Sequence, residues 1–207
     1  MPLPFPTANF RSPRAVLLFV LPAVMGLGLD LWSKHEAFAR LKIGERVSPI
    51  GRIEVLSERY QLVPGWIQLE LTANYGAVFG AGQGMRWFFL SVSVAAIVAL
   101  VWLFARSERR FRLYQFVLGM LLAGVMGNLF DRAVFGYVRD MIHGLPGWHW
   151  PGRWVIPLLN YPGWDREVFP YIFNLADSYL CVGVALVMIH MYRHPHKPGE
   201  GATEKRA

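Results

Sequence analysis

Four apolar stretches, each long enough to cross a bilayer, constrain this sequence more than any other feature. About 20 helical residues at a rise of roughly 1.5 Å span a hydrocarbon core of about 30 Å. Unpaired backbone groups in lipid cost several kcal/mol each, so each stretch is expected to be a helix. The expected spans are residues 15–32, 87–105, 113–130 and 171–192.

The composition is that of a membrane protein. Apolar residues make up 54% of the chain and charged residues 17%, whereas soluble domains carry about 25% charged residues. The apolar content excludes intrinsic disorder, and the single cysteine, Cys181, excludes a disulfide framework. Basic residues occur in short clusters between apolar runs, which argues against an extended nucleic-acid-binding surface.

Positive charge in the short loops predicts the orientation. The loop at residues 106–112 is short and strongly basic, and Arg11 and Arg14 precede the first span. Both termini are therefore expected in the cytoplasm, and segments 34–86 and 131–170 outside it. The first span is expected to be an uncleaved anchor, because no signal-peptidase-like cleavage site follows it.

The chain is expected to form one membrane-embedded domain over residues 1–192. Residues 193–207 are polar and rich in Pro and Gly, and are expected to be a disordered cytoplasmic tail. Short β-like runs at residues 52–56 and 66–71 predict a small sheet. The predicted fold is an all-α integral membrane protein with four transmembrane helices and a small extracytoplasmic β-rich subdomain.

Charged and amide side chains at membrane depth form three groups. A charge at the bilayer centre costs at least about 2.5–3.5 kcal/mol. In each group the later members lie three or four residues after the first, on one helix face. The predicted topology brings all three groups to the outer leaflet, with Asp177 about six residues inside its span. The groups are Asp30 with Lys34, Asn128 with Asp131 and Arg132, and Asn174 with Asp177 and Ser178.

Each group also has a purely structural interpretation. The first group resembles an interfacial ion pair, and Asp131–Arg132 can lock a loop to its helix. Asn128 and Asn174 can hydrogen-bond between helices, an interaction worth about 0.6–2 kcal/mol in membranes. Asp177 favours function, because no basic residue lies near it in its own helix. Small residues at Gly119, Ala123 and Gly127 predict a packing face.

Two aspartates suggest acid–base chemistry. Asp140 follows the third span, and Asp177 lies at the start of the fourth. Two adjacent carboxylates cannot both ionise cheaply, so one keeps a proton while the other acts as a base. Such a pair can activate water against an amide carbonyl and protonate the leaving nitrogen.

Other chemistries are poorly supplied with residues. Cys181 has no nearby His and is expected to pack, and Ser91 and Ser93 have no basic partner. A metal site would use Asp140, His143 and His149. The sequence has no H-E-x-x-H or comparable ligand spacing to support one.

Four motifs occur in order along the chain. They are Asp30-x-x-x-Lys34; Asn74-Tyr-Gly-Ala-Val-Phe79; Gly127-Asn-Leu-Phe-Asp-Arg132 with Gly136-x-Val-x-Asp140; and Phe173-Asn-Leu-Ala-Asp177-Ser178. Together they resemble the bacterial lipoprotein signal peptidases (signal peptidase II), which are four-span aspartic endopeptidases of the inner membrane. The resemblance covers residues 15–192. This chain departs from the family pattern at Leu31, at Val78, and in a longer segment between the two acids.

The resemblance implies that Asp140 and Asp177 are catalytic. It implies a diacylglyceryl-modified prolipoprotein substrate, cut just before the lipidated cysteine, with no cofactor and no metal. It also implies a monomer in contact with membrane lipid, with both termini cytoplasmic and the site near the periplasmic face. Site-lining or supporting roles fall to Asn74, Gly76, Asn128, Arg132, Asn174, Asp30 and Lys34.

An alternative is a small multi-span transporter or lipid-handling protein that uses Asp140 and Asp177 as proton-relay carboxylates. It predicts inverted repeats or broken helices in matching halves, which are not seen. A non-catalytic scaffold leaves the convergent acids unexplained. The Trp-rich, Pro-broken segment 141–170 is expected either to lie on the outer leaflet beside the acids or to be a passive loop.

Overall fold

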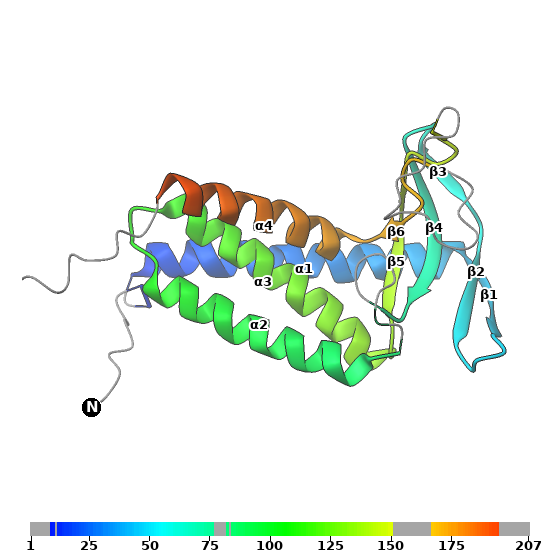
Figure 1. The fold of residues 1–207 in the computed structure, drawn as a ribbon, viewed down its shortest axis with the longest axis horizontal. Helices are drawn as coiled ribbons and strands as arrows, with labels where there is room; N and C mark the ends of the chain where they lie inside the picture. The colour runs from blue at the N-terminus through cyan, green and yellow to red at the C-terminus, as the bar shows by residue number, and fades with distance from the viewer. Residues whose placement is uncertain (1–8, 11, 77–81, 83, 151–166, 195–207) are drawn as a thin grey trace, which may run out of the picture.

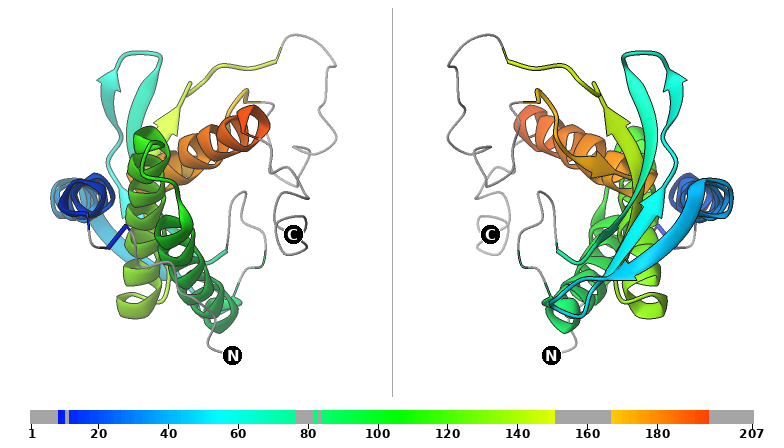
Figure 2. Two further views of the ribbon diagram at one scale, coloured as in Figure 1. Left: turned by 90° about the vertical axis from the view of Figure 1, so that its left-hand side faces the viewer. Right: turned by 90° about the vertical axis from the view of Figure 1, so that its right-hand side faces the viewer.

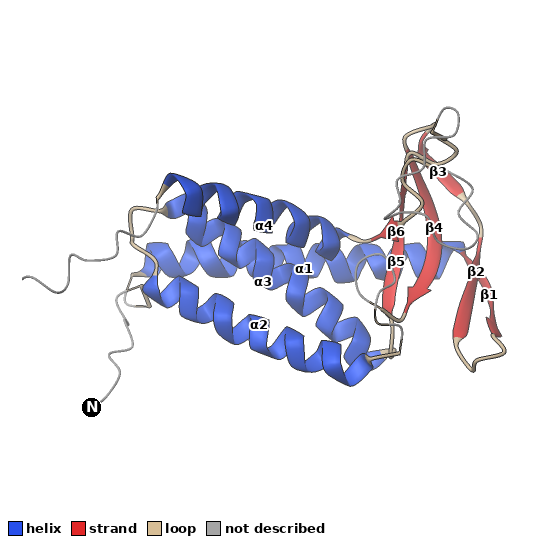
Figure 3. Cartoon of the chain, in the orientation of Figure 1, coloured by secondary structure: helices blue, strands red, loops and turns tan. Residues whose placement is uncertain are grey.

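The computed structural model describes residues 9–194 except for residues 11, 77–81, 83 and 151–166. Four helices run side by side, and strands stand across their axes at one end (Figures 1 and 3). Each helix is long and apolar enough to cross a membrane, which confirms the four predicted spans. The helices are α1 (Pro13–Leu41), α2 (Arg86–Arg106), α3 (Arg112–Val134) and α4 (Leu175–Arg193).

Helix α3 is the centre of the bundle and packs against α1, α2 and α4. Its small residues explain how closely the helices approach. A Cβ atom on Gly119 would overlap the backbone carbonyl of Phe19 in α1, so only glycine fits there. A Cβ atom on Gly127 would overlap the carboxylate of Asp30. The predicted packing face is confirmed.

In the part of the chain that the structure describes, six short strands form two antiparallel sheets. β1 (Lys42–Val47) pairs with β2 (Ile53–Ser57), and a second sheet has the order β3-β4-β5-β6. The predicted β-like runs are confirmed in β2 and β4, but the all-α class is wrong. The class was wrong because strands that lie far apart in the sequence pair with one another, and local sequence patterns do not reveal such pairing. The second sheet comprises β3 (Tyr60–Val63), β4 (Ile67–Asn74), β5 (Val138–Gly144) and β6 (Ile172–Phe173).

Both sheets lie at the same end of the helix bundle (Figure 1). The described ends of the chain and the short connection between α2 and α3 lie at the opposite end (Figures 1 and 2). The two long connections therefore share one end, which is the relation that the basic loops predicted.

The start of α4 differs from the prediction. The helix begins at Leu175, because Asn174 caps it and residues Ile172–Phe173 pair with β5 instead. The side chain of Asn174 accepts a hydrogen bond from the Asp177 N–H at 3.0 Å, and the Asp177 carboxylate accepts one from the Asn174 N–H at 3.2 Å. Asp177 therefore lies in the first turn of α4, not six residues inside a span.

Part of the Trp-rich segment is described. Trp148 is 45% exposed, and its ring centroid lies 5.2 Å from that of Trp66. Trp154 and Trp164 lie outside the described residues. The two interpretations of this segment stay as predictions.

Candidate functional site

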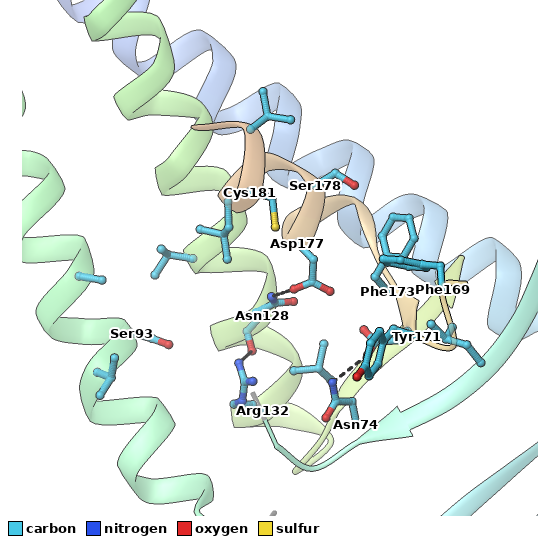
Figure 4. A pocket seen from close by; sticks show the side chains of 18 residues that line it. Asn74, Ser93, Asn128, Arg132, Phe169, Tyr171, Phe173, Asp177, Ser178 and Cys181 are labelled. Carbon is cyan, nitrogen blue, oxygen red and sulfur yellow. Dashed lines mark hydrogen bonds between the residues drawn. The ribbon is translucent and has the colours of Figure 1, made fainter. Parts of the chain in front are cut away.

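A cavity of about 640 Å³ opens between α2, α3, α4 and the adjoining sheet. Figure 4 shows Asp177 and Asn128 joined by a hydrogen bond on one side of the cavity, with Ser93 on the facing helix α2. Asp140 also lines this cavity, so the fold brings together the two aspartates that are 37 residues apart in sequence. The apolar walls include Val92, Ala96, Val125, Leu180, Val182, Phe169 and Phe173.

Asn174 connects the two aspartates. Its Oδ1 atom accepts the hydrogen bond from the Asp177 backbone, so its other side-chain atom must be the Nδ2 donor. That Nδ2 atom donates to Oδ1 of Asp140 at 2.6 Å. The residue that caps α4 therefore also holds the buried carboxyl group of β5.

Asn128 of α3 is oriented by a lysine. The Nζ atom of Lys34, which can only donate, lies 3.2 Å from Oδ1 of Asn128. The Nδ2 atom of Asn128 is thereby directed to Oδ1 of Asp177, at 2.8 Å. Both oxygens of Asp177 accept hydrogen bonds, one from this amide and one from the Asn174 backbone.

Asn74 and Arg132 complete the polar wall. Nδ2 of Asn74 donates to Oδ2 of Asp140 at 3.0 Å, and Oδ1 of Asn74 accepts from the Gly76 N–H at 2.9 Å. Arg132 donates to the carbonyl of Gly76 at 2.8 Å, and its guanidinium lies 5.0 Å from the centre of the Phe89 ring. Together they fix the backbone at Gly76 beside the cavity.

Asp140 is almost completely buried, at 1% exposure. Burial raises its pKa well above that of an ordinary aspartate, and the negative charge of Asp177 raises it further. The hydrogen bonds from Asn74 and Asn174 act in the opposite direction. Asp140 therefore holds its proton at pH values where an ordinary aspartate has lost it.

A second polar cluster lies behind this wall, and we call it the ion network. Lys34 Nζ lies 2.7 Å from a carboxylate oxygen of Asp30 and 3.2 Å from one of Asp131. Arg139 donates to Asp131 at 2.8 Å, and Asp30 accepts from the backbone N–H of Ala176 at 3.0 Å. The network ties α1, α3, β5 and the start of α4 together.

This network bears on two structural interpretations of the sequence. Asp30 and Lys34 do form an ion pair, and both side chains are buried inside the protein with no exposed surface. Asp131 does lock its helix to the following segment, but through Arg139 on β5 instead of through Arg132. Asn128 and Asn174 bond to each other between helices, and each also contacts one of the two aspartates.

Sequence reasoning missed Arg139 and the aromatic cavity wall. Neighbouring residues on a strand point to opposite faces, so an extended segment at residues 138–144 would have placed Arg139 opposite Asp140. Phe169 and Tyr171 precede helix α4 and gave no pattern that links them to the acids.

Other candidate groups have different surroundings. Cys181 lines the cavity and is exposed, contrary to the packing role expected for it. Within the described part of the chain, no group of three or more His, Cys, Asp or Glu side chains is arranged to hold a metal ion. His143 faces Glu70 and Glu167, not Asp140.

Comparison with known proteins decides the family. The family model described as signal peptidase (SPase) II matches residues 22–193. The chain belongs to the signal peptidase II family. It is therefore a membrane-embedded peptidase, and the transporter alternative is not favoured.

Relatives across distant bacteria agree with this assignment. The lipoprotein signal peptidase of Rhodopirellula baltica is 33% identical over 97% of this chain and 85% of its own length. That of Bacillus subtilis is 30% identical over 84% of this chain and 93% of its own length.

Solved structures share the fold. One described as a bacterial membrane enzyme superposes with a TM-score of 0.64 at 27% identity, covering 87% of this chain and 91% of its own. A second with the same description gives a TM-score of 0.61 at 26% identity, covering 84% and 92%. The signal peptidase II chain described here thus has the architecture of known membrane enzymes.

Proposed function

We propose that this chain is an aspartic endopeptidase in which Asp140 and Asp177 are the catalytic residues. The observation that carries the proposal is their convergence on one cavity, joined by Asn174. Their environments differ. Asp140 is buried with a raised pKa, while both oxygens of the half-buried Asp177 accept hydrogen bonds. Environments that separate two carboxyl groups in this way assign one as the acid and the other as the base.

The chemistry follows from that difference. Asp177 takes a proton from a water molecule as the water oxygen attacks the scissile carbonyl carbon, and Asp140 gives its proton to the carbonyl oxygen. The tetrahedral intermediate then collapses. Asp177 passes its proton to the leaving nitrogen as the C–N bond breaks, and Asp140 recovers a proton from the intermediate's hydroxyl group. No covalent enzyme intermediate forms.

The amides and the ion network support this pair. Asn128 and Asn174 hold the two carboxylates in position. Lys34 in turn holds Asn128, and Asp30 holds the start of α4. Arg132 and Asn74, which both line the cavity, also fix the Gly76 backbone beside it.

The proposed substrate is a prolipoprotein that carries diacylglycerol on its lipobox cysteine, cut just before that cysteine. The relatives are named lipoprotein signal peptidases. The site fits such a substrate because its carboxylates face a cavity with apolar walls formed by α2, α3 and α4. A lipid-anchored peptide can present its acyl chains to these walls and its scissile bond to the acids.

The proposed setting is the bacterial inner membrane, with both termini in the cytoplasm and the sheets and acids near the periplasmic face. The basic loop between α2 and α3 supports this orientation. Residues 1–192 would form one domain in contact with lipid, acting as a monomer, with residues 193–207 as its tail.

The test uses the purified protein in detergent with a diacylglyceryl-modified prolipoprotein, followed by gel mobility. Cleavage of the modified substrate, absence of cleavage of the unmodified one, and no effect of EDTA are expected. Asp140→Asn and Asp177→Asn should not cleave the modified substrate, whereas Glu58→Gln, the same acid-to-amide change at an exposed position, should cleave normally. A reversible loss with EDTA that zinc restores would contradict the dyad.

A further inference from the structure

Residues 167–171, which we call the return segment, lead the chain back to β6. Phe169 and Tyr171 of this segment wall the catalytic cavity (Figure 4). The backbone N–H of Val168 donates to the carbonyl of Trp148 at 2.6 Å, and the Phe169 ring packs edge-on against Phe173 with centroids 5.7 Å apart. The position of this segment therefore sets the shape of one side of the cavity.

Glu167 anchors the return segment through its carboxylate. One oxygen accepts the backbone N–H of Gly147 at 3.0 Å, and the other lies 3.3 Å from Nε2 of His143. His143 is only 8% exposed and belongs to β5, the strand that also carries Asp140. The anchor thus joins the cavity wall to the strand of a proposed catalytic residue.

A second carboxylate faces the other side of the same imidazole ring. Nδ1 of His143 lies 3.7 Å from Oε2 of Glu70 on β4. Glu70 is itself held by Arg59 and Gln68, each donating at 3.0 Å. These side chains line a separate polar cavity of about 500 Å³.

The protonation state of His143 decides whether both contacts exist. A protonated imidazole donates from both nitrogens, whereas a neutral ring presents one lone pair, which a carboxylate repels. The charged groups facing the ring are Glu70 from β4, Glu167 from the return segment, and Arg59, which pairs with Glu70. The nearby carboxylates of Glu70 and Glu167 raise the pKa of His143, against the effect of burial. The double contact is therefore complete at low pH and is lost as the pH rises through this raised pKa.

We propose that His143 is a positioning residue for substrate binding, whose imidazolium ties Glu167 to Glu70 and so holds Phe169 and Tyr171 against the cavity. The inference rests on the proposed function of that cavity. Loss of the proton leaves one N–H for two carboxylates and removes the charge that attracts both, so the hold on Glu167, and with it on the wall formed by Phe169 and Tyr171, weakens. Because neither Glu167 nor His143 touches Asp177, the effect falls on KM and not on kcat.

The experiment measures kcat and KM for a diacylglyceryl-modified prolipoprotein across pH. The wild type, His143→Gln, Glu167→Gln and His143→Arg are compared, with His35→Gln, an exposed histidine, as the matched control. Below the His143 pKa, His143→Gln and Glu167→Gln should each raise KM roughly 5-fold, as expected for one partly buried ion pair. Their kcat should stay unchanged, and the wild-type KM should rise toward theirs at higher pH.

His143→Arg keeps a charge at every pH and has the polar cavity beside it, so its KM should stay low across the whole range. The double variant His143→Gln/Glu167→Gln should raise KM no more than either single variant, because both substitutions break the same ion pair. The proposal would be overturned if the KM of His143→Gln varied with pH as it does in the wild type. It would also be overturned if His143→Gln and Glu167→Gln changed kcat alone. Failure of the dyad would appear separately, as cleavage by Asp140→Asn.

Discussion

The ion network and the proposed catalytic dyad, Asp140 with Asp177, are adjacent polar clusters with opposite arrangements. In the network, Lys34 and Arg139 neutralise Asp30 and Asp131, and all four side chains are buried. In the dyad, amides and a backbone N–H replace the cations, and both acids line a cavity. Paired charges hold a fold, while carboxyl groups that accept hydrogen bonds from neutral amides, with no cation in direct contact, can exchange protons. The difference separates the structural cluster from the reactive one.

The largest expected effect comes from the dyad. Asp140→Asn and Asp177→Asn should each reduce cleavage by at least about 10³-fold, because general acid–base groups contribute roughly 10²–10⁴ and act as a unit. Both variants should insert and fold normally. The measurement is the initial cleavage rate per amount of folded protein in detergent. Near-normal turnover by either folded variant would mean that the two aspartates are not a reactive cluster distinct from the ion network.

Lys34→Met should have the next largest effect, on stability. It leaves two buried carboxylates without their shared cation, which costs about 3–5 kcal/mol. Lys42→Met is the matched control, because Lys42 pairs with Glu45 at the surface and such pairs contribute about 0–1 kcal/mol. Denaturant unfolding in detergent compares the two, and equal stabilities would mean that the network does not hold the fold.

The bridging amides should lie between these extremes. Asn128→Ala and Asn174→Ala should lower activity about 10²-fold, since each removes a fixed donor at the acids. An interhelical hydrogen bond is worth only about 0.6–2 kcal/mol, and a helix cap about 1 kcal/mol. Activity and melting temperature are measured on the same samples. If the variants unfold while the folded remainder keeps its specific activity, the amides belong with the network.

The smallest expected effect is a gain in stability. The raised pKa of Asp140 means that its contribution to stability is complete below its unfolded pKa and declines as the pH rises through the folded value. Asp140→Asn removes this decline, so its melting temperature should exceed that of the wild type by a few degrees at neutral and alkaline pH. Identical melting curves across pH would show that burying the Asp140 charge has no cost.

Apolar run length was enough to predict the four helices, because lipid leaves the backbone few alternatives. Periodicity and topology also brought Asp30, Asn128 and Asn174 to one end of the bundle. The sheet containing β5 was not predicted, since its partner β4 lies more than sixty residues earlier in the chain.

The site was predicted unevenly for the same reason. Asp140 and Asp177 came from residue type and family motifs, whereas Arg139 and Glu167 act through tertiary contacts that no local spacing encodes. The start of α4 was misplaced because the capping residue Asn174 lies inside an apolar run.

The most direct test of the central claim is infrared detection of the protonated carboxyl group at neutral pH. The wild type is compared with Asp140→Asn and Asp177→Asn as difference spectra. We expect the carbonyl band of a protonated aspartic acid to disappear in Asp140→Asn and to survive in Asp177→Asn, because Asp140 holds the shared proton. A band that survives in Asp140→Asn and disappears in Asp177→Asn would reverse the roles, and no change in either variant would contradict a shared proton altogether.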